Sequence, residues 1–98
     1  MFVTTQPEAL SMAAENLGAI GSAVSSQNVA AAAPTTGIIP AASDEVSVLT
    51  ATQFVAHANM YHSIMTEAAA IHEMFVKTLS TSAMSYAATE AANATATG

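Results

Sequence analysis

Hydrophobic and polar positions recur with helical periodicity in a first long segment, residues 7–33. At about 100° per residue, the apolar and small residues of this segment gather on one side. Leu10, Leu17 and Val24 are one heptad apart, a spacing typical of two close-packed antiparallel helices. The pattern predicts a helix whose apolar side comprises Ala9, Leu10, Ala13, Ala14, Leu17, Ile20, Gly21, Val24 and Ala31.

A second helix is predicted over residues 44–88, because no proline or glycine interrupts the chain between Asp44 and Glu90. Ser43 is its predicted N-cap, and Asp44 and Glu45 suit the positive end of the helix dipole. The apolar residues cover about 200° of this helix, which is too wide for one neighbouring helix to bury. They are Val46, Leu49, Phe54, Met60, Tyr61, Ile64, Met65, Ile71, Met74, Phe75, Val76, Leu79, Met84 and Tyr86.

A loop over residues 34–43 is predicted to join the two helices. Pro40 disfavours a helical conformation in the residue before it, and Gly37 favours a turn. Residues 91–98 are expected to form a frayed tail. The sequence thus predicts an all-α fold, a single domain over residues 1–98 that forms a two-helix antiparallel hairpin.

The predicted lengths of the two helices leave part of the second one uncovered. At 1.5 Å per residue, the first helix spans about 40 Å and the second about 70 Å. The far end of the second helix, with Leu79, Met84 and Tyr86, then has no neighbour within the chain. A two-helix hairpin also has no closed core, and its exposed apolar surface exceeds what soluble monomers tolerate. We therefore expect this chain to be one half of a larger helical assembly.

Composition and charge narrow the classes of function. The chain has 98 residues, of which 52% are hydrophobic and 8% are charged, and its formal net charge is −6. Lys77 is the only cation, so binding to a nucleic-acid backbone is excluded, because nothing is available to release counterions. The absence of cysteine rules out disulfides, thiol catalysis and zinc-thiolate sites. The beginning of the chain lacks the basic and apolar regions of a cleavable signal peptide. Taken alone, this feature predicts a protein that stays where it is made.

Candidate catalytic and metal-binding residues do not form a recognisable site. His72 and Glu73 begin an H-E-x-x-H motif, but Val76 stands where the second zinc ligand is needed. His57 and His62 would point about 140° apart on a helix, so they cannot share a metal. We expect His57 and His72 on the apolar side and His62 exposed, and we expect no enzyme activity, metal or cofactor.

Two short patterns mark the ends of the predicted helices. Thr5 and Glu8 have the spacing of a capping box, in which each side chain satisfies a backbone amide of the first helical turn. Tyr86 and Glu90 are four residues apart near the end of the second helix, so they share one helical face. By the residues alone, this second pair is a simple helix end.

An ordered series of motifs resembles the PE family of mycobacteria, which is named for a Pro-Glu pair near the N-terminus. That pair is Pro7-Glu8 here, and the resemblance extends over essentially the whole chain. The other matching stretches are Phe2-Val3, Ala9-Leu10, Ala13-Ala14, Leu17-x-x-Ile20-Gly21-Ser22, the run from Asn28 to Thr36, the run from Pro40 to Ser47, Phe54-x-x-His57-Ala58, Phe75-Val76 and Tyr86-x-x-x-Glu90 with Ala91-Ala92-Asn93.

The resemblance implies a partner and a route of export. PE proteins form helical hairpins that complete a four-helix bundle with a PPE-family protein, as a 1:1 heterodimer. The pair is exported folded through an ESX type VII secretion system, so the resemblance overrides the expectation that the chain stays where it is made. The family's secretion signal, Y-x-x-x-[D/E], maps onto Tyr86 and Glu90. A secretion chaperone is expected to bind the PPE partner and not this chain, and the exported pair is secreted or associated with the cell surface.

Three hypotheses for function follow. The favoured one is an interaction module and secretion substrate paired with a PPE protein. The second is a homodimeric helical bundle with a structural role at the cell surface, and co-expression with and without a PPE partner separates the two. An enzyme is disfavoured. The predicted partner interface comprises Leu10, Leu17, Ile20, Val24, Phe54, Met60, Tyr61, Ile64, Met65, Ile71, Phe75 and Leu79.

Overall fold

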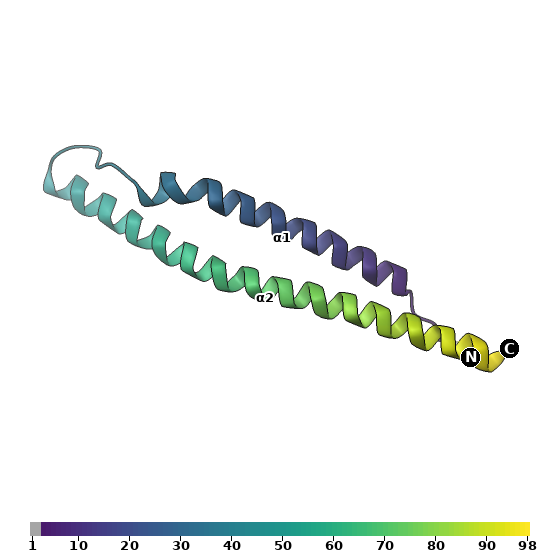
Figure 1. Cartoon of the computed structure of the whole chain (residues 1–98). Helices are drawn as coiled ribbons and strands as arrows, with labels where there is room; N and C mark the ends of the chain where they lie inside the picture. The colour runs from purple at the N-terminus through teal and green to yellow at the C-terminus, as the bar shows by residue number, and fades with distance from the viewer. Residues whose placement is uncertain (1–2) are drawn as a thin grey trace. The chain divides into compact units, whose positions relative to one another are not determined.

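The computed structural model describes residues 3–98, and the regular secondary structure in that range is entirely helical (Figure 1). Helix α1 spans Pro7–Thr36, 30 residues, and helix α2 spans Glu45–Thr97, 53 residues. No strand occurs among the described residues. The predicted all-α class is confirmed.

Helix α1 ends at Thr36, whereas the sequence predicted its end at Ala33 and a loop from residue 34. Pro34 lies inside the last turn and cannot donate a backbone hydrogen bond there. The hydroxyls of Thr35 and Thr36 donate to carbonyls one turn earlier, at 2.6 and 2.7 Å. The amide of Gly37 donates to the carbonyl of Ala33 at 3.0 Å. The hydroxyl bonds add to the backbone bonds of the last turn, and the Gly37 amide satisfies one of the terminal carbonyls, so the helix continues past the proline.

The N-cap of helix α2 is Asp44, one residue later than the predicted Ser43. The backbone amide of Ser47 donates to Asp44 Oδ2 at 3.0 Å, and the Ser47 hydroxyl donates to Oδ1 at 2.7 Å. These two hydrogen bonds favour the ionised carboxylate, and they hold the pKa of Asp44 below its usual value.

Helix α2 continues to Thr97, so most of the predicted tail over 91–98 is helical. The segment after Glu90 is rich in alanine, the strongest helix former, and it contains no glycine or proline before Gly98. Gly98, the residue after the helix, has a positive φ of 112°, a conformation that glycine adopts without strain. Propensity therefore carries the helix beyond the predicted end.

The chain divides into two compact units, which are described separately. Unit 1 consists of the described residues up to Gly21 together with Ile71–Gly98, and unit 2 consists of Ser22–Ala70. Each unit contains one part of α1 and one part of α2. In unit 2 the loop after Gly37 reverses the chain, so the helices of this unit are antiparallel (Figure 1).

The helix–helix interface of each unit is built from small side chains. Ala14 and Ala83 are buried in unit 1, and Ala51 and Ala58 are buried in unit 2. They are the only buried hydrophobic residues among residues 3–98. Small residues at heptad or near-heptad spacing let two helix backbones approach closely. Such an interface buries little apolar area, because alanine carries a single methyl group.

Candidate protein-interaction surface

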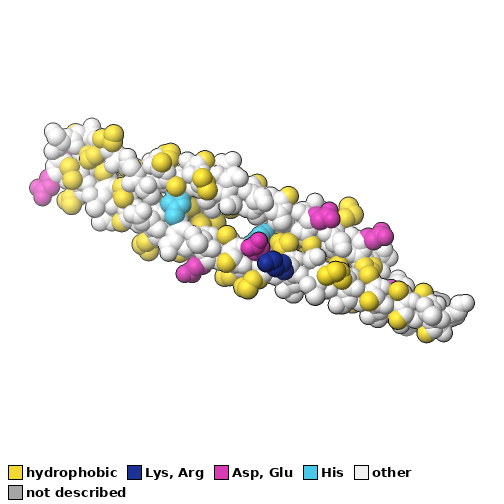
Figure 2. All heavy atoms as spheres, in the orientation of Figure 1, with side chains coloured by type: hydrophobic (Ala, Val, Ile, Leu, Met, Phe, Trp, Pro, Cys, Tyr) yellow, Lys and Arg dark blue, Asp and Glu magenta, His cyan; other side chains and the backbone are white. Residues whose placement is uncertain are grey.

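Large hydrophobic side chains lie on the outside of both units, whereas the interior contains alanine. Hydrophobic side chains are spread over the visible face in Figure 2. Ile71 is 62% exposed in unit 1, and Phe54 is 60% exposed in unit 2. Exposed apolar side chains in such numbers mark an interaction site more often than a free surface.

The apolar surface of unit 2 includes Phe54, Met60, Tyr61 and Ile64, all of which are exposed. Phe54 and Tyr61 are one heptad apart, and each comes three residues after a buried alanine of the interface. They therefore lie next to the line of contact between the helices. The Tyr61 hydroxyl donates to Asn28 Oδ1 at 2.9 Å, which fixes the ring against α1.

The apolar surface of unit 1 includes Ile71, Met74 and Phe75, which are exposed on α2. Helix α1 adds Met12 and Ile20, which are also exposed. Ile71, Met74 and Phe75 are spaced three and four residues apart, so they share one side of the helix. A partner helix laid along this side could cover all three.

The predicted interface residues divide into two groups by exposure. The exposed residues are Ile20, Val24, Phe54, Met60, Tyr61, Ile64, Ile71 and Phe75. Those already half-buried within the chain are Leu10, Leu17, Met65 and Leu79. The half-buried group has less surface left to offer, so it contributes less to any second contact. Their assignment to a partner interface stays a prediction.

Two of the histidines connect α1 to α2, and one of these, His62, differs from what the sequence predicted. His62 was expected to be exposed, but it is half-buried and forms a 3.3 Å hydrogen bond with Thr35 Oγ1 in unit 2. His72 is half-buried in unit 1, and its Nε2 lies 2.6 Å from the carbonyl oxygen of Leu17. His57, expected on the apolar side of the second helix, is exposed within this chain, as is Phe54 on the same helix. No three metal-ligating side chains come together within residues 3–98.

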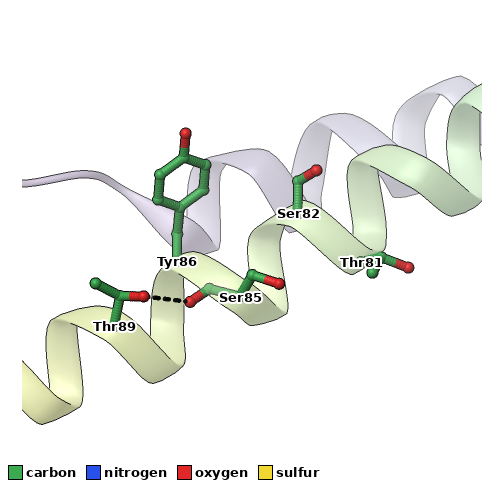
Figure 3. A pocket seen from close by; sticks show the side chains of 5 residues that line it. All are labelled: Thr81, Ser82, Ser85, Tyr86 and Thr89. Atoms are coloured by element: carbon green, nitrogen blue, oxygen red, sulfur yellow. Dashed lines mark hydrogen bonds between the residues drawn. The ribbon is translucent and has the colours of Figure 1, made fainter.

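A shallow depression surrounds Tyr86 on α2 in unit 1 (Figure 3). The Tyr86 ring stands away from the helix on the same side as Ser82, and it is 46% exposed. The hydroxyl of Thr89 donates back to the carbonyl of Ser85 at 3.0 Å, so it does not reach the tyrosine. The lining residues are Thr81, Ser82, Ser85, Tyr86 and Thr89.

Glu90 is half-buried and bound, whereas its place at the predicted helix end suggested a free carboxylate. Its Oε1 accepts hydrogen bonds from the backbone amide of Thr5 at 3.0 Å and from the Thr5 hydroxyl at 3.1 Å. Thr5 thus bonds to α2, and the predicted capping box with the exposed Glu8 is not formed. No local pattern could reveal this contact, because the two residues are 85 positions apart.

Comparison with known proteins decides the family. The family model described as the PE family matches residues 3–93. The chain belongs to the PE family. PE family protein PE13 of Mycobacterium tuberculosis (strain ATCC 25618 / H37Rv) is 59% identical over 95 residues, which are 97% of this chain and 96% of that protein.

Longer PE proteins match over the same region. PE family protein PE8 of the same strain is 53% identical over 95 residues, which cover 97% of this chain and 34% of PE8. PE-PGRS family protein PE_PGRS33 of Mycobacterium tuberculosis (strain CDC 1551 / Oshkosh) is 50% identical over 93 residues, 95% of this chain and 20% of that protein. The resemblance that the motifs indicated is confirmed.

Within residues 3–98 of this PE chain, no helix has the length and hydropathy needed to cross a membrane.

Proposed function

We propose that this PE chain is a non-enzymatic interaction module that pairs with a PPE-family protein and is exported with it through an ESX type VII secretion system. The partner's helices would cover the apolar surfaces of both units and complete a four-helix bundle. The chaperone of the system would bind the PPE protein, and the pair would reach the outside or surface of the cell. Membership of the PE family supports this proposal.

One observation carries the pairing part of the proposal. The buried hydrophobic residues within 3–98 are four alanines, while side chains as large as Phe54, Ile71 and Phe75 are more than half exposed. Burying each such side chain stabilises by about 1.5–3 kcal/mol. The chain cannot gain this energy from its own interfaces, so a second protein that supplies an apolar face has a large driving force to bind.

Expression of the chain alone and together with a candidate PPE protein tests the pairing. Alone, the chain is expected to be insoluble or self-associated, because its apolar surfaces remain uncovered. Together, the two chains should purify as a 1:1 complex that buries well over the roughly 1,600 Å² of a standard interface. Light scattering and analytical ultracentrifugation give the mass.

The other outcomes of this test are also decisive. A monodisperse monomer that melts cooperatively at micromolar concentration would contradict the need for any partner. A stable, soluble dimer of the chain that ignores the PPE protein would support the homodimeric structural role in its place.

The export part of the proposal rests on Tyr86 and Glu90, the positions that match the family's Y-x-x-x-[D/E] signal. Both lie on α2 in unit 1, and the tyrosine ring is 46% exposed. An exposed aromatic ring one helical turn from a carboxylate can be bound by another protein through packing and a charge-assisted hydrogen bond. Cell fractionation of variants at both positions tests this role.

A further inference from the structure

Two hydrogen bonds in unit 1 tie Glu90 to Thr5, in the segment that precedes α1. The amide and the hydroxyl of Thr5 both donate to Glu90 Oε1, at 3.0 and 3.1 Å. Both residues are half-buried. Hydrogen bonds to an ionised acceptor are about twice as strong as neutral ones, and two donors on one oxygen restrict its position. The carboxylate is therefore held by the N-terminal segment.

The hydrogen-bonded carboxylate keeps one oxygen for another molecule. Both donors converge on Oε1, and no hydrogen bond from residues 3–98 reaches Oε2. Glu90 is only half-buried, and Tyr86, one turn earlier on the same helical face, is 46% exposed. The contact orients the carboxylate and does not enclose it.

We infer that Thr5 is a positioning residue of the export signal formed by Tyr86 and Glu90. This inference rests on the proposed function and adds a regulatory feature to it. With its carboxylate already oriented beside the tyrosine, the signal binds its receptor without ordering a flexible side chain first, which lowers the entropic cost of recognition. The complete signal then exists only where the N-terminal segment is docked on α2, so unit 1 must be folded before it is recognised.

A purely structural role gives a different pattern of effects. A carboxylate near the start of α1 also interacts favourably with the positive end of that helix. If this were the whole role of the contact, export would fall only as far as the stability of the PE–PPE pair falls. A positioning role lowers export while the pair remains assembled.

Substitution of Thr5 in the co-expressed pair separates these roles. Thr5→Val keeps the shape and the backbone amide but removes the hydroxyl, whereas Thr5→Ser keeps the hydroxyl. Export of Thr5→Val should fall about tenfold, the factor expected for one lost hydrogen bond to a charged group. Thr5→Ser should restore export, and Thr4→Val, at an exposed neighbour, should not change it.

Measurements on the purified pair show whether the contact itself changed. Hydrogen exchange of the residue-5 amide and the carboxylate carbon shift of Glu90, both by NMR, should change in Thr5→Val and return in Thr5→Ser. The melting temperature of the pair should fall only slightly in Thr5→Val, because the residue-5 amide still donates to Glu90 Oε1, and it should be unchanged in Thr5→Ser and Thr4→Val. A fall in export with these two spectroscopic changes, while the pair remains assembled, supports the inference.

Three results would overturn it. Unchanged export of Thr5→Val means that the contact is irrelevant to recognition, and increased export means that Thr5 conceals Glu90. Loss of export together with loss of the pair means that Thr5 acts only on stability.

Tyr86→Ala separates this inference from the proposed signal. Normal export of Tyr86→Ala means that the proposed signal itself is rejected. Blocked export of Tyr86→Ala beside normal export of Thr5→Val rejects only the part played by Thr5.

Discussion

At the scale of single residues, Gly21 and His72 show how closely the two helices of unit 1 approach. A Cβ atom placed on Gly21 would lie 2.7 Å from Cδ2 and 2.9 Å from Nε2 of the imidazole ring. The Leu17 carbonyl can only accept, so the bond of 2.6 Å requires a proton on His72 Nε2. Gly21→Ala should displace the ring, break this bond and lower the unfolding free energy of the PE–PPE pair by about 1–3 kcal/mol. Thermal and urea melts of the purified pair measure the change.

Gly18 provides the matched control for this substitution. A Cβ atom on Gly18 would meet Val76 Cγ1 at 3.9 Å, an ordinary contact distance. Because alanine is a better helix former than glycine by about 1 kcal/mol, Gly18→Ala should be neutral or mildly stabilising. Equal destabilisation by Gly18→Ala and Gly21→Ala would contradict the close packing of His72.

At the scale of elements, the Asp44 cap makes the start of α2 sensitive to acid. The hydrogen bonds from Ser47 lower the pKa of Asp44 below its usual 3.8. A carboxylate whose pKa is lower in the folded chain stabilises fully above the unfolded pKa and loses this effect as the pH falls through the folded pKa. The stability difference between the unmodified pair and Asp44→Ala should therefore be constant near neutral pH and shrink below about pH 4.

An uncharged cap gives the control for the acid effect. Asp44→Asn retains a side-chain oxygen that accepts from the Ser47 amide, but it does not titrate in this range. Its stability difference from Asp44→Ala should stay constant where that of the unmodified pair declines, as measured by melts from pH 3 to 7. Parallel curves for the aspartate and asparagine forms would show that the Asp44 charge is not involved.

The sequence predicts the elements better than the contacts between them. Helical periodicity and the absence of proline and glycine identify both helices, because these signals are local. Helix α1 ends three residues later than predicted, and hydroxyl bonds from Thr35 and Thr36 reinforce the last turn, which contains Pro34. The bond from Thr5 to Glu90 and the bond from His62 to Thr35 join distant parts of the chain. Periodicity gives the side of a helix on which a residue lies, but not the atom that it meets.

At the scale of the whole molecule, the exposed apolar side chains belong to the energetics of assembly and not to those of the chain alone. Phe75 is 55% exposed within the chain, so Phe75→Ala should cost about 3 kcal/mol of complex stability, the lower part of the range for a fully buried ring. Ser63→Ala, at an exposed polar position, should be nearly neutral. Titration calorimetry or denaturant melts of the pair compare the two. Similar losses would mean that the partner does not cover the side of α2 that carries Phe75.

The export signal provides the last prediction, and the bond between Thr5 and Glu90 changes how it is tested. Glu90→Ala removes a charge and also two hydrogen bonds, so it would weaken unit 1 as well as any signal. Glu90→Gln keeps an oxygen that accepts from Thr5, but it removes the charge and replaces the second oxygen by an amide donor. If the signal is an aromatic ring beside a carboxylate, Tyr86→Ala and Glu90→Gln should each abolish export. The melting temperature of the pair should then stay nearly unchanged in Glu90→Gln.

Fractionation of cells that express each variant, beside a melt of the purified pair, gives both quantities. Normal export of both variants would remove Tyr86 and Glu90 from the functional residues. Loss of export in Tyr86→Ala with a failed pair would place the tyrosine in the partner interface. Loss of export in Glu90→Gln with an intact pair comes from the altered carboxylate and not from a lost bond to Thr5, because the acceptor for Thr5 is still present.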